Sequence, residues 1–121
     1  MSPGKPRILI IEDQIILALH VADVLEDIGC EPVGPFSSVS AGLPVALNDR
    51  LDAALLDVYL TDQTVKPIAD ILRSRGIAFA FMTAFTRLHL PEAHRARPFL
   101  CEPFTDRQLR AAVTTLIGGE P

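Results

Sequence analysis

Three short, continuous apolar runs constrain the fold of this chain more than any other feature of its sequence. They lie at residues 8–11, 53–56 and 77–82, and no charged side chain interrupts them. Uniformly apolar strands are buried on both faces, which is typical of a parallel sheet with helices on each side. Residues 30–36 and 98–101 are weaker strand candidates because both contain proline, but their places in the alternation support them.

Segments with helical periodicity separate these runs. Between the first two strands, apolar side chains recur at helical spacing, and Gly29 follows them as a C-terminal stop. A later helix ends in the same way at Gly76. The predicted helices cover residues 15–28, 38–48, 65–75 and 107–117.

Local composition refines the predictions for two of these helices and for the fourth crossover. Gly42 and Pro44 both weaken a helix, so the second helix is expected to be short or kinked. Asp106 is expected to cap the last helix, because an aspartate oxygen can accept a hydrogen bond from a free N–H group of the first turn. Residues 86–97 contain Pro91 and show little apolar periodicity, so we expect loop or a single turn in this fourth crossover.

The alternation of strand and helix predicts an α/β fold, a doubly wound five-stranded parallel sheet whose ligands bind beyond the carboxyl ends of the strands. The 121 residues suit one domain, predicted at residues 7–121 after a disordered leader at residues 1–6. The leader has no apolar core and no cleavage site, and no apolar run approaches the length of a bilayer. We therefore expect a soluble, cytoplasmic protein that does not bind a membrane.

Charge and cysteine content exclude further classes. The formal charge is -4, with 49% apolar and 21% charged residues, so the chain offers no basic stripe and we expect no nucleic acid partner. Arg87, Arg95 and Arg97 form a local cluster, interpreted as a solvated surface or a protein contact. Cys30 and Cys101 lack neighbouring ligands at metal spacing, so both are expected to be buried free thiols.

Acidic residues follow the ends of several predicted strands. Glu12 and Asp13 follow the first strand, and Asp57 follows the third. A lone acid in such a place is often a helix cap, and Asp13 alone could be one. Three carboxylates at one edge of a sheet raise one another's pKa, and a bound divalent cation resolves this repulsion. An all-oxygen ligand set favours Mg²⁺. The fourth and fifth strands end in Thr83 and Glu102.

These residues, in this order, resemble the receiver domain of two-component response regulators over residues 7–117, which implies a flavodoxin-like sheet. The resemblance implies that Glu12 and Asp13 bind Mg²⁺. It also implies that Asp57 binds the metal and accepts a phosphoryl group, and that the backbone carbonyl of Tyr59 completes the metal ligands. The chain would then be a phosphoacceptor in a phosphorelay and not an enzyme, with self-phosphorylation chemistry at most.

The resemblance assigns switching roles to two further residues. The Thr83 hydroxyl would move toward the phosphoryl oxygen, and Phe99 would follow it inward as a switch aromatic. Taken alone, Thr83 is equally a β-branched strand residue and Phe99 a core aromatic. The implied partners are a sensor histidine kinase or phosphotransfer protein and a downstream protein.

A narrower resemblance is to the FAT GUY group of receivers. It rests on three segments: residues 81–85, Phe-Met-Thr-Ala-Phe; residues 90–92, Leu-Pro-Glu; and residues 98–104, Pro-Phe-Leu-Cys-Glu-Pro-Phe. That group often consists of single-domain regulators with a degenerate fourth helix, which fits the weak periodicity of residues 86–97. No output domain follows in this sequence, so if this chain is the whole protein, it is expected to act through partners.

The chain departs from the family pattern at Glu102, where receivers have a lysine that pairs with the phosphoryl oxygen. A carboxylate about 4–5 Å from that anion would be unfavourable by about 3–4 kcal/mol as an upper bound, with an effective dielectric near 20. Glu102 could turn to solvent, be protonated or join the metal ligands, and Lys66 could supply a substitute cation. The loop at residues 60–64 also lacks the group's usual glycine.

Glu102 therefore keeps a second hypothesis open, a pseudo-receiver that binds a partner without phosphorylation. Two other classes fit poorly. A haloacid dehalogenase-like phosphatase needs two aspartates separated by one residue after the first strand, and residues 12–14, Glu-Asp-Gln, do not supply them. A flavin-binding module needs a loop rich in Ser, Thr and Gly, and residues 13–16 contain none of these.

Overall fold

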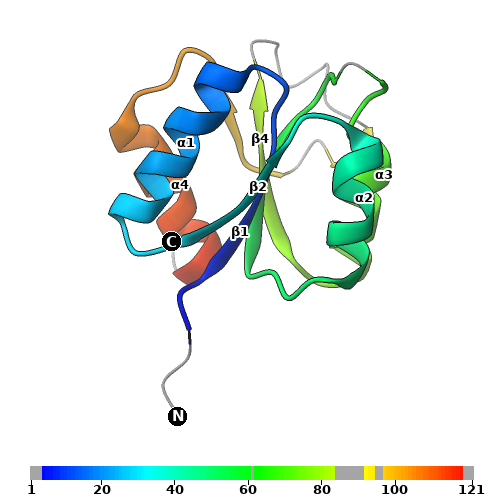
Figure 1. Cartoon of the computed structure of the whole chain (residues 1–121), viewed down its shortest axis with the longest axis horizontal. Helices are drawn as coiled ribbons and strands as arrows, with labels where there is room; N and C mark the ends of the chain where they lie inside the picture. Colours follow the sequence, from blue (N-terminus) through cyan, green and yellow to red (C-terminus); the bar gives the residue numbers. More distant parts are fainter. Residues whose placement is uncertain (1–3, 61, 84–91, 95–96, 119–121) are drawn as a thin grey trace.

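The computed structural model describes residues 4–60, 62–83, 92–94 and 97–118. Five parallel strands form one sheet in the order β2-β1-β3-β4-β5 (Figure 1). This confirms the predicted doubly wound sheet, and its strand order is the flavodoxin-like one. The strands are β1 (Arg7–Ile11), β2 (Glu31–Phe36), β3 (Ala53–Asp57), β4 (Ala78–Thr83) and β5 (Phe99–Cys101).

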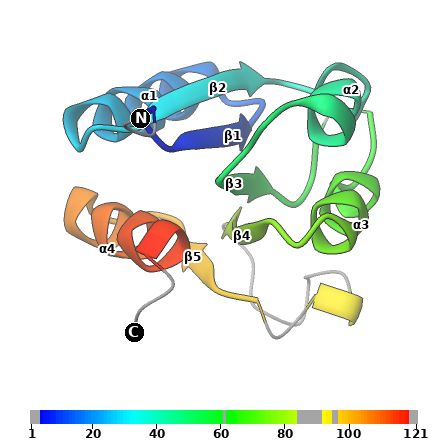
Figure 2. The ribbon, with the colours of Figure 1, turned by 90° about the horizontal axis from the view of Figure 1, so that it is seen from below.

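Helices cover both faces of the sheet. In Figure 2 the first and last helices lie on one side, and the two middle helices lie on the other. They are α1 (Ile15–Asp27), α2 (Val39–Asn48), α3 (Lys66–Ser74) and α4 (Asp106–Gly118), and a short 3₁₀ helix, η2, spans Glu92–His94. Within the part of the chain that the structure describes, no helix is long and apolar enough to cross a membrane.

The two-sided covering explains the continuous apolar runs. On β1, Leu9 and Ile11 belong to the core under α2 and α3, whereas Ile8 and Ile10 belong to the core under α1 and α4. All four side chains are fully buried. Because successive residues of a strand point to opposite faces, a strand between two helical layers needs an apolar residue at every position.

Helix α2 continues through Gly42 and Pro44 to Asn48, so it is not short, which corrects the first of the two alternatives expected for this segment. Gly42 is buried against the sheet, and a Cβ atom there would lie 2.4 Å from Cδ1 of Ile11. The glycine therefore lets α2 approach β1 closely. The Ser38 hydroxyl caps the helix by accepting from the Ala41 N–H at 3.1 Å.

The cap of α4 is Thr105 and not Asp106. The Thr105 hydroxyl accepts from the Gln108 N–H at 3.0 Å, and the Gln108 side chain accepts from the Thr105 N–H at 2.8 Å. This reciprocal pair is a capping box, which satisfies two N–H groups where an aspartate cap satisfies one. Asp106 is free to pair with Nε2 of His20 on α1 at 2.6 Å.

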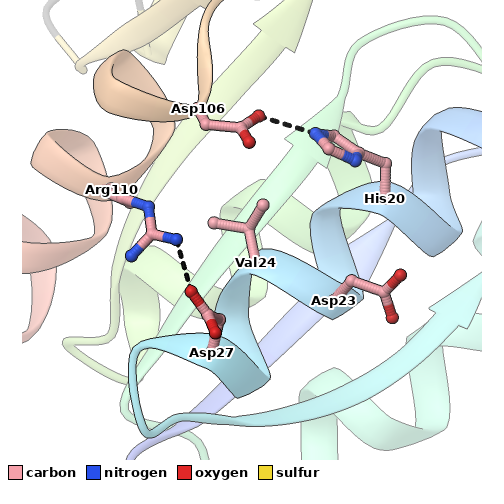
Figure 3. Close-up of a pocket in the computed structure, with 6 residues that line it drawn as sticks. All are labelled: His20, Asp23, Val24, Asp27, Asp106 and Arg110. Carbon is pink, nitrogen blue, oxygen red and sulfur yellow. Dashed lines mark hydrogen bonds and ion pairs between the residues drawn. The ribbon is translucent and has the colours of Figure 1, made fainter.

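A shallow groove of about 300 Å³ separates α1 from α4. Figure 3 shows the two ion pairs that bridge it, His20 with Asp106 and Arg110 with Asp27. Val24 and Asp23 complete its lining. The three acids predicted at the strand ends are not among these residues, so the groove is distinct from the candidate site described below.

The remaining predictions have mixed outcomes. Cys30 is buried, as expected, but Cys101 is exposed because it ends the short edge strand β5.

Within the fourth crossover, η2 is the helical turn that the structure describes. Arg87 and Arg95 lie outside the described residues. Arg97 lies within them, and its guanidinium stacks 4.4 Å from the ring centroid of Phe79.

Candidate functional site

The topology brings the carboxyl ends of β1 and β3 side by side. These strands are paired, with Ile11 opposite Leu56, so the residues that follow each strand emerge at the same edge of the sheet. One carboxylate oxygen from each of Glu12, Asp13 and Asp57 lies within 4.8 Å of the others. The structure thus brings together the three acids that the sequence placed at strand ends.

Glu12 is the most deeply placed of the three acids. Its exposed fraction is only 2%, and its Oε2 accepts a hydrogen bond from the Gln14 N–H at 2.9 Å. Its Oε1 is buried and has no hydrogen-bond partner among the described residues. A buried carboxylate oxygen without a donor is costly, so this atom indicates a place for a cation or a proton.

The environment raises the pKa of two of these acids. Burial is the largest cause for both Glu12 and Asp57, because it disfavours the charged form. The charges of the neighbouring acids raise the pKa of Asp57 further, those of Glu12 and Asp13 in particular. Without a cation, the cluster therefore tends to retain a proton at neutral pH.

Glu102 lies beside this cluster but is not one of the three converging acids. Its backbone N–H donates to the Thr83 carbonyl oxygen at 2.7 Å, which extends the pairing of β4 with β5. Its side chain is half-buried. Burial, followed by the charge of Asp13, raises the pKa of Glu102, and Glu102 in turn raises that of Glu12. Glu102 thus adds negative charge to the pocket.

Thr83 and Phe99 occupy the neighbouring strands β4 and β5. Thr83 ends β4 and is 1% exposed, one position beyond the residue paired with Asp57. Phe99 starts β5 opposite Phe81 and packs, half-buried, against the core under α2 and α3. The switching roles of Thr83 and Phe99 stay predictions.

The loop after Asp57 contains Tyr59, whose side chain is 42% exposed. Tyr59 forms an isolated antiparallel bridge with Thr64, so this loop folds back on itself without a glycine. Nζ of Lys66 pairs with Oδ2 of Asp70 at 2.8 Å, one turn along α3. The hypothesis that Lys66 supplies a cation to the acidic cluster finds no support in this contact.

Two features of the surroundings carried no clear signal in the sequence. The Asp62 carboxylate accepts hydrogen bonds from Val39 and Ser40 in the first turn of α2, over separations of 23 and 22 residues. His94 is buried and bonds Asp70 over a separation of 24 residues. Both contacts join residues far apart in the chain, so periodicity could not reveal them.

The donor set suits a hard divalent cation. Three carboxylate oxygens converge, Oε1 of Glu12 is buried without a hydrogen-bond partner among the described residues, and burial raises the pKa values of Glu12 and Asp57. Oxygen ligands of this kind are those preferred by Mg²⁺. The strand order, the two helical layers and this cluster together define a receiver-type α/β domain.

Comparisons with known proteins agree with this class. No family model matches the chain. The solution structure of SdrG from Sphingomonas melonis Fr1 is 32% identical and superposes with a TM-score of 0.83, over 96% of this chain and 99% of that one. A CheY-like response regulator receiver domain from Methanospirillum hungatei JF-1 has a TM-score of 0.85 at 21% identity, over 96% of each chain. The chain belongs to the CheY-like response regulator receiver domains.

Two further matches are informative. The transcriptional regulatory protein PdtaR of Mycobacterium tuberculosis is 28% identical over 111 residues, which are 88% of this chain and 54% of PdtaR. The chain thus spans about half the length of that curated relative. The receiver domain of the sensor histidine kinase PA1611 from Pseudomonas aeruginosa PAO1 has a TM-score of 0.81 at 20% identity, over 95% of this chain and 99% of that one. Its crystal structure contains a magnesium ion coordinated in the active site cleft.

Proposed function

We propose that residues 7–121 form a phosphorelay receiver in which Asp57 accepts a phosphoryl group with the help of Mg²⁺. The observation that carries this proposal is the convergence of Glu12, Asp13 and Asp57 at the edge of the sheet. Such a concentration of buried and half-buried acid is costly for a fold, and acids with perturbed pKa values, such as Glu12 and Asp57, gather at functional sites.

Glu12, Asp13, Asp57 and the backbone carbonyl of Tyr59 would hold the metal. The first three are supported by their mutual distance, and the buried Oε1 of Glu12 lacks any other partner among the described residues. When bound, Mg²⁺ supplies positive charge that offsets both the acids and the transferring phosphoryl group.

Asp57 would act as the nucleophile. One of its carboxylate oxygens attacks phosphorus, the bond from phosphorus to the donor's histidine nitrogen breaks, and that nitrogen keeps the electron pair and takes up a proton. The attack needs an ionised Asp57, whose pKa is raised by burial and by Glu12. The Thr83 hydroxyl, at the end of the neighbouring strand, would donate to a phosphoryl oxygen of the product.

The proposed partners are a sensor histidine kinase or phosphotransfer protein and a downstream protein, met in the cytoplasm. An exposed aliphatic surface at the start of α1 supports a protein donor. Ile15, Ile16 and Leu19 are 64%, 81% and 52% exposed, and the first of them lies two residues after Asp13. Large exposed aliphatic groups next to a reactive pocket favour contact with another protein over a small-molecule donor alone.

A pseudo-receiver that binds its partner without phosphorylation is the second candidate, and Glu102 is the observation that favours it. Its side chain is half-buried near the acidic cluster, so it adds to the negative charge there. A cation at this position would attract the incoming phosphoryl group, whereas a carboxylate repels it.

Intact mass spectrometry distinguishes the two candidates. The protein is incubated with Mg²⁺ and either acetyl phosphate or a cognate kinase, beside Asp57→Ala as the matched control. A gain of one phosphoryl group in the wild type alone supports the phosphoacceptor. If the wild type gains none with either donor, the phosphoacceptor proposal fails and the pseudo-receiver remains.

A further inference from the structure

Asp62 ties the loop that follows Asp57 to the start of α2. Its Oδ1 accepts from the Val39 N–H at 3.1 Å. Its Oδ2 accepts from both the N–H and the hydroxyl of Ser40, at 3.2 and 3.1 Å. One side chain thus receives three hydrogen bonds from two consecutive residues of the neighbouring helix.

The charge of Asp62 suits this position. The hydrogen bond from the Val39 N–H is the main cause that lowers the pKa of Asp62, so the side chain is ionised at neutral pH. The free N–H groups at the start of a helix carry partial positive charge, which favours a carboxylate there. Ser38 already caps α2 from within its own segment. Asp62 is therefore a second cap, supplied by a different part of the chain.

The same loop is closed at successive levels by backbone contacts. The Val65 N–H donates to the Val58 carbonyl at 2.9 Å, at the base of the loop. Tyr59 pairs with Thr64 above it, and the Leu60 N–H donates to the Gln63 carbonyl at 3.1 Å. Asp62 lies beyond these contacts and fixes the far end of the loop to α2.

We infer that Asp62 is a positioning residue that holds the backbone at Tyr59 in the orientation needed for its carbonyl to bind the metal. This inference rests on the proposed function, because it requires the Tyr59 carbonyl to be one of the Mg²⁺ ligands. Asp62 itself is not one of these ligands. A carbonyl turns with its peptide plane, so a loop anchored at its base and its far end presents that oxygen in a narrower range of directions. Groups that orient metal ligands in this way commonly change metal affinity by about 10- to 100-fold when removed.

The sequence supplies a local probe for the test. Tyr59 is the only tyrosine of the chain, and there is no tryptophan, so tyrosine fluorescence reports on this loop alone. Mg²⁺ affinity is measured by isothermal titration calorimetry, and Tyr59 anisotropy is recorded in parallel. The variants are Asp62→Ala and Asp62→Asn, with Ser38→Ala as the matched control because it removes a cap of α2 without touching the loop.

We expect Asp62→Ala to weaken Mg²⁺ binding by about tenfold and to lower Tyr59 anisotropy. Asp62→Asn keeps one acceptor oxygen, so its affinity should lie between those of the wild type and Asp62→Ala. Ser38→Ala should lower the unfolding temperature while leaving the Mg²⁺ affinity unchanged.

Two results overturn the inference while leaving the proposed function intact. One is an Asp62→Ala protein that binds Mg²⁺ as tightly as the wild type. The other is a Ser38→Ala protein that loses as much affinity as Asp62→Ala, because Asp62 would then act only by stabilising α2. A wild type that binds no Mg²⁺ overturns both the inference and the proposed function.

Discussion

Nε2 of His94 lies 2.7 Å from Oδ1 of Asp70, and this contact fastens η2 to α3. The His94 side chain is fully buried, with its ring 5.5 Å from that of Phe79 in an edge-on arrangement. Asp70 also pairs with Lys66, and these two contacts lower its pKa. The crossover between β4 and β5, which begins directly after Thr83, is thus attached at η2 to a helix on the α2 and α3 side of the sheet.

The first prediction concerns this attachment. His94→Ala should lower the free energy of unfolding by about 2–4 kcal/mol, because it leaves a cavity over Phe79 and removes a hydrogen bond. Asp70→Asn keeps the packing and should cost only about 1 kcal/mol. Urea unfolding measures both, with Arg73→Ala on the exposed side of α3 as the control. If His94→Ala matched Arg73→Ala in stability, the attachment would contribute nothing to the fold.

The second prediction is a pH dependence of stability without metal. The pKa values of Glu12 and Asp57 are raised in the folded protein, so it binds more protons than the unfolded chain. The free energy of unfolding should therefore fall as the pH rises from the usual carboxyl range, about pH 4, through these raised pKa values. Thermal unfolding in a chelating buffer checks this, and Asp57→Asn should flatten the curve.

The third prediction is that Mg²⁺ reverses this loss. A ligand that binds only the folded state stabilises it by about 2.7 kcal/mol when its concentration is roughly 100 times its dissociation constant. The effect should be largest at the alkaline end, where Glu12 and Asp57 are ionised. The same melting experiment with Mg²⁺ and with Na⁺ at equal ionic strength measures it. Equal stabilisation by both salts would argue for screening and against a bound metal.

The fourth prediction concerns the charge at position 102. Glu102→Lys should raise the rate of phosphorylation by acetyl phosphate by about tenfold or more, since the electrostatic change is up to several kcal/mol. Glu102→Gln removes one charge and should give an intermediate rate. Intact mass against time measures all three proteins. Identical rates would show that the Glu102 carboxylate does not act on the incoming phosphoryl group.

The fifth prediction tests the close approach of α2 to β1. Gly42→Ala would place a Cβ atom 2.4 Å from Cδ1 of Ile11 and 3.2 Å from Cδ1 of Ile68, both buried. Overpacking of this kind should destabilise the fold by about 1–3 kcal/mol. Gly118→Ala is the matched control, because a Cβ there meets nothing within 4 Å. An equally stable Gly42→Ala protein would mean that Ile11 can move aside.

Sequence reasoning reached the sheet and its acidic edge because both follow from local patterns. Apolar runs predict buried parallel strands, and the adjacency of β1 and β3 brings Glu12 and Asp13 to Asp57. Contacts between segments that are distant in the sequence could not be predicted from such local patterns. The close packing of α2 on β1 depends on the fit of Gly42 against Ile11, and the exposure of Cys101 depends on β5 being an edge.

The wrong prediction of the α4 cap has a different cause. The signal was present, because Thr105 and Gln108 have the spacing of a capping box, but Asp106 is also a good cap residue by type. The choice between adjacent candidates depends on where the helix begins. His94 gave no comparable signal, since its partner Asp70 comes from another helix.

The hydrogen bond from the Glu102 N–H to the Thr83 carbonyl separates the structural role of this residue from its effect on the charge of the pocket. The backbone at position 102 serves the sheet, while only its side chain bears on the acids. Strand pairing therefore does not depend on the charge of the side chain at position 102. Substitution at this single position can invert the local field while the scaffold stays the same, so a lineage could gain or lose sensitivity to phosphoryl donors without having to refold the domain.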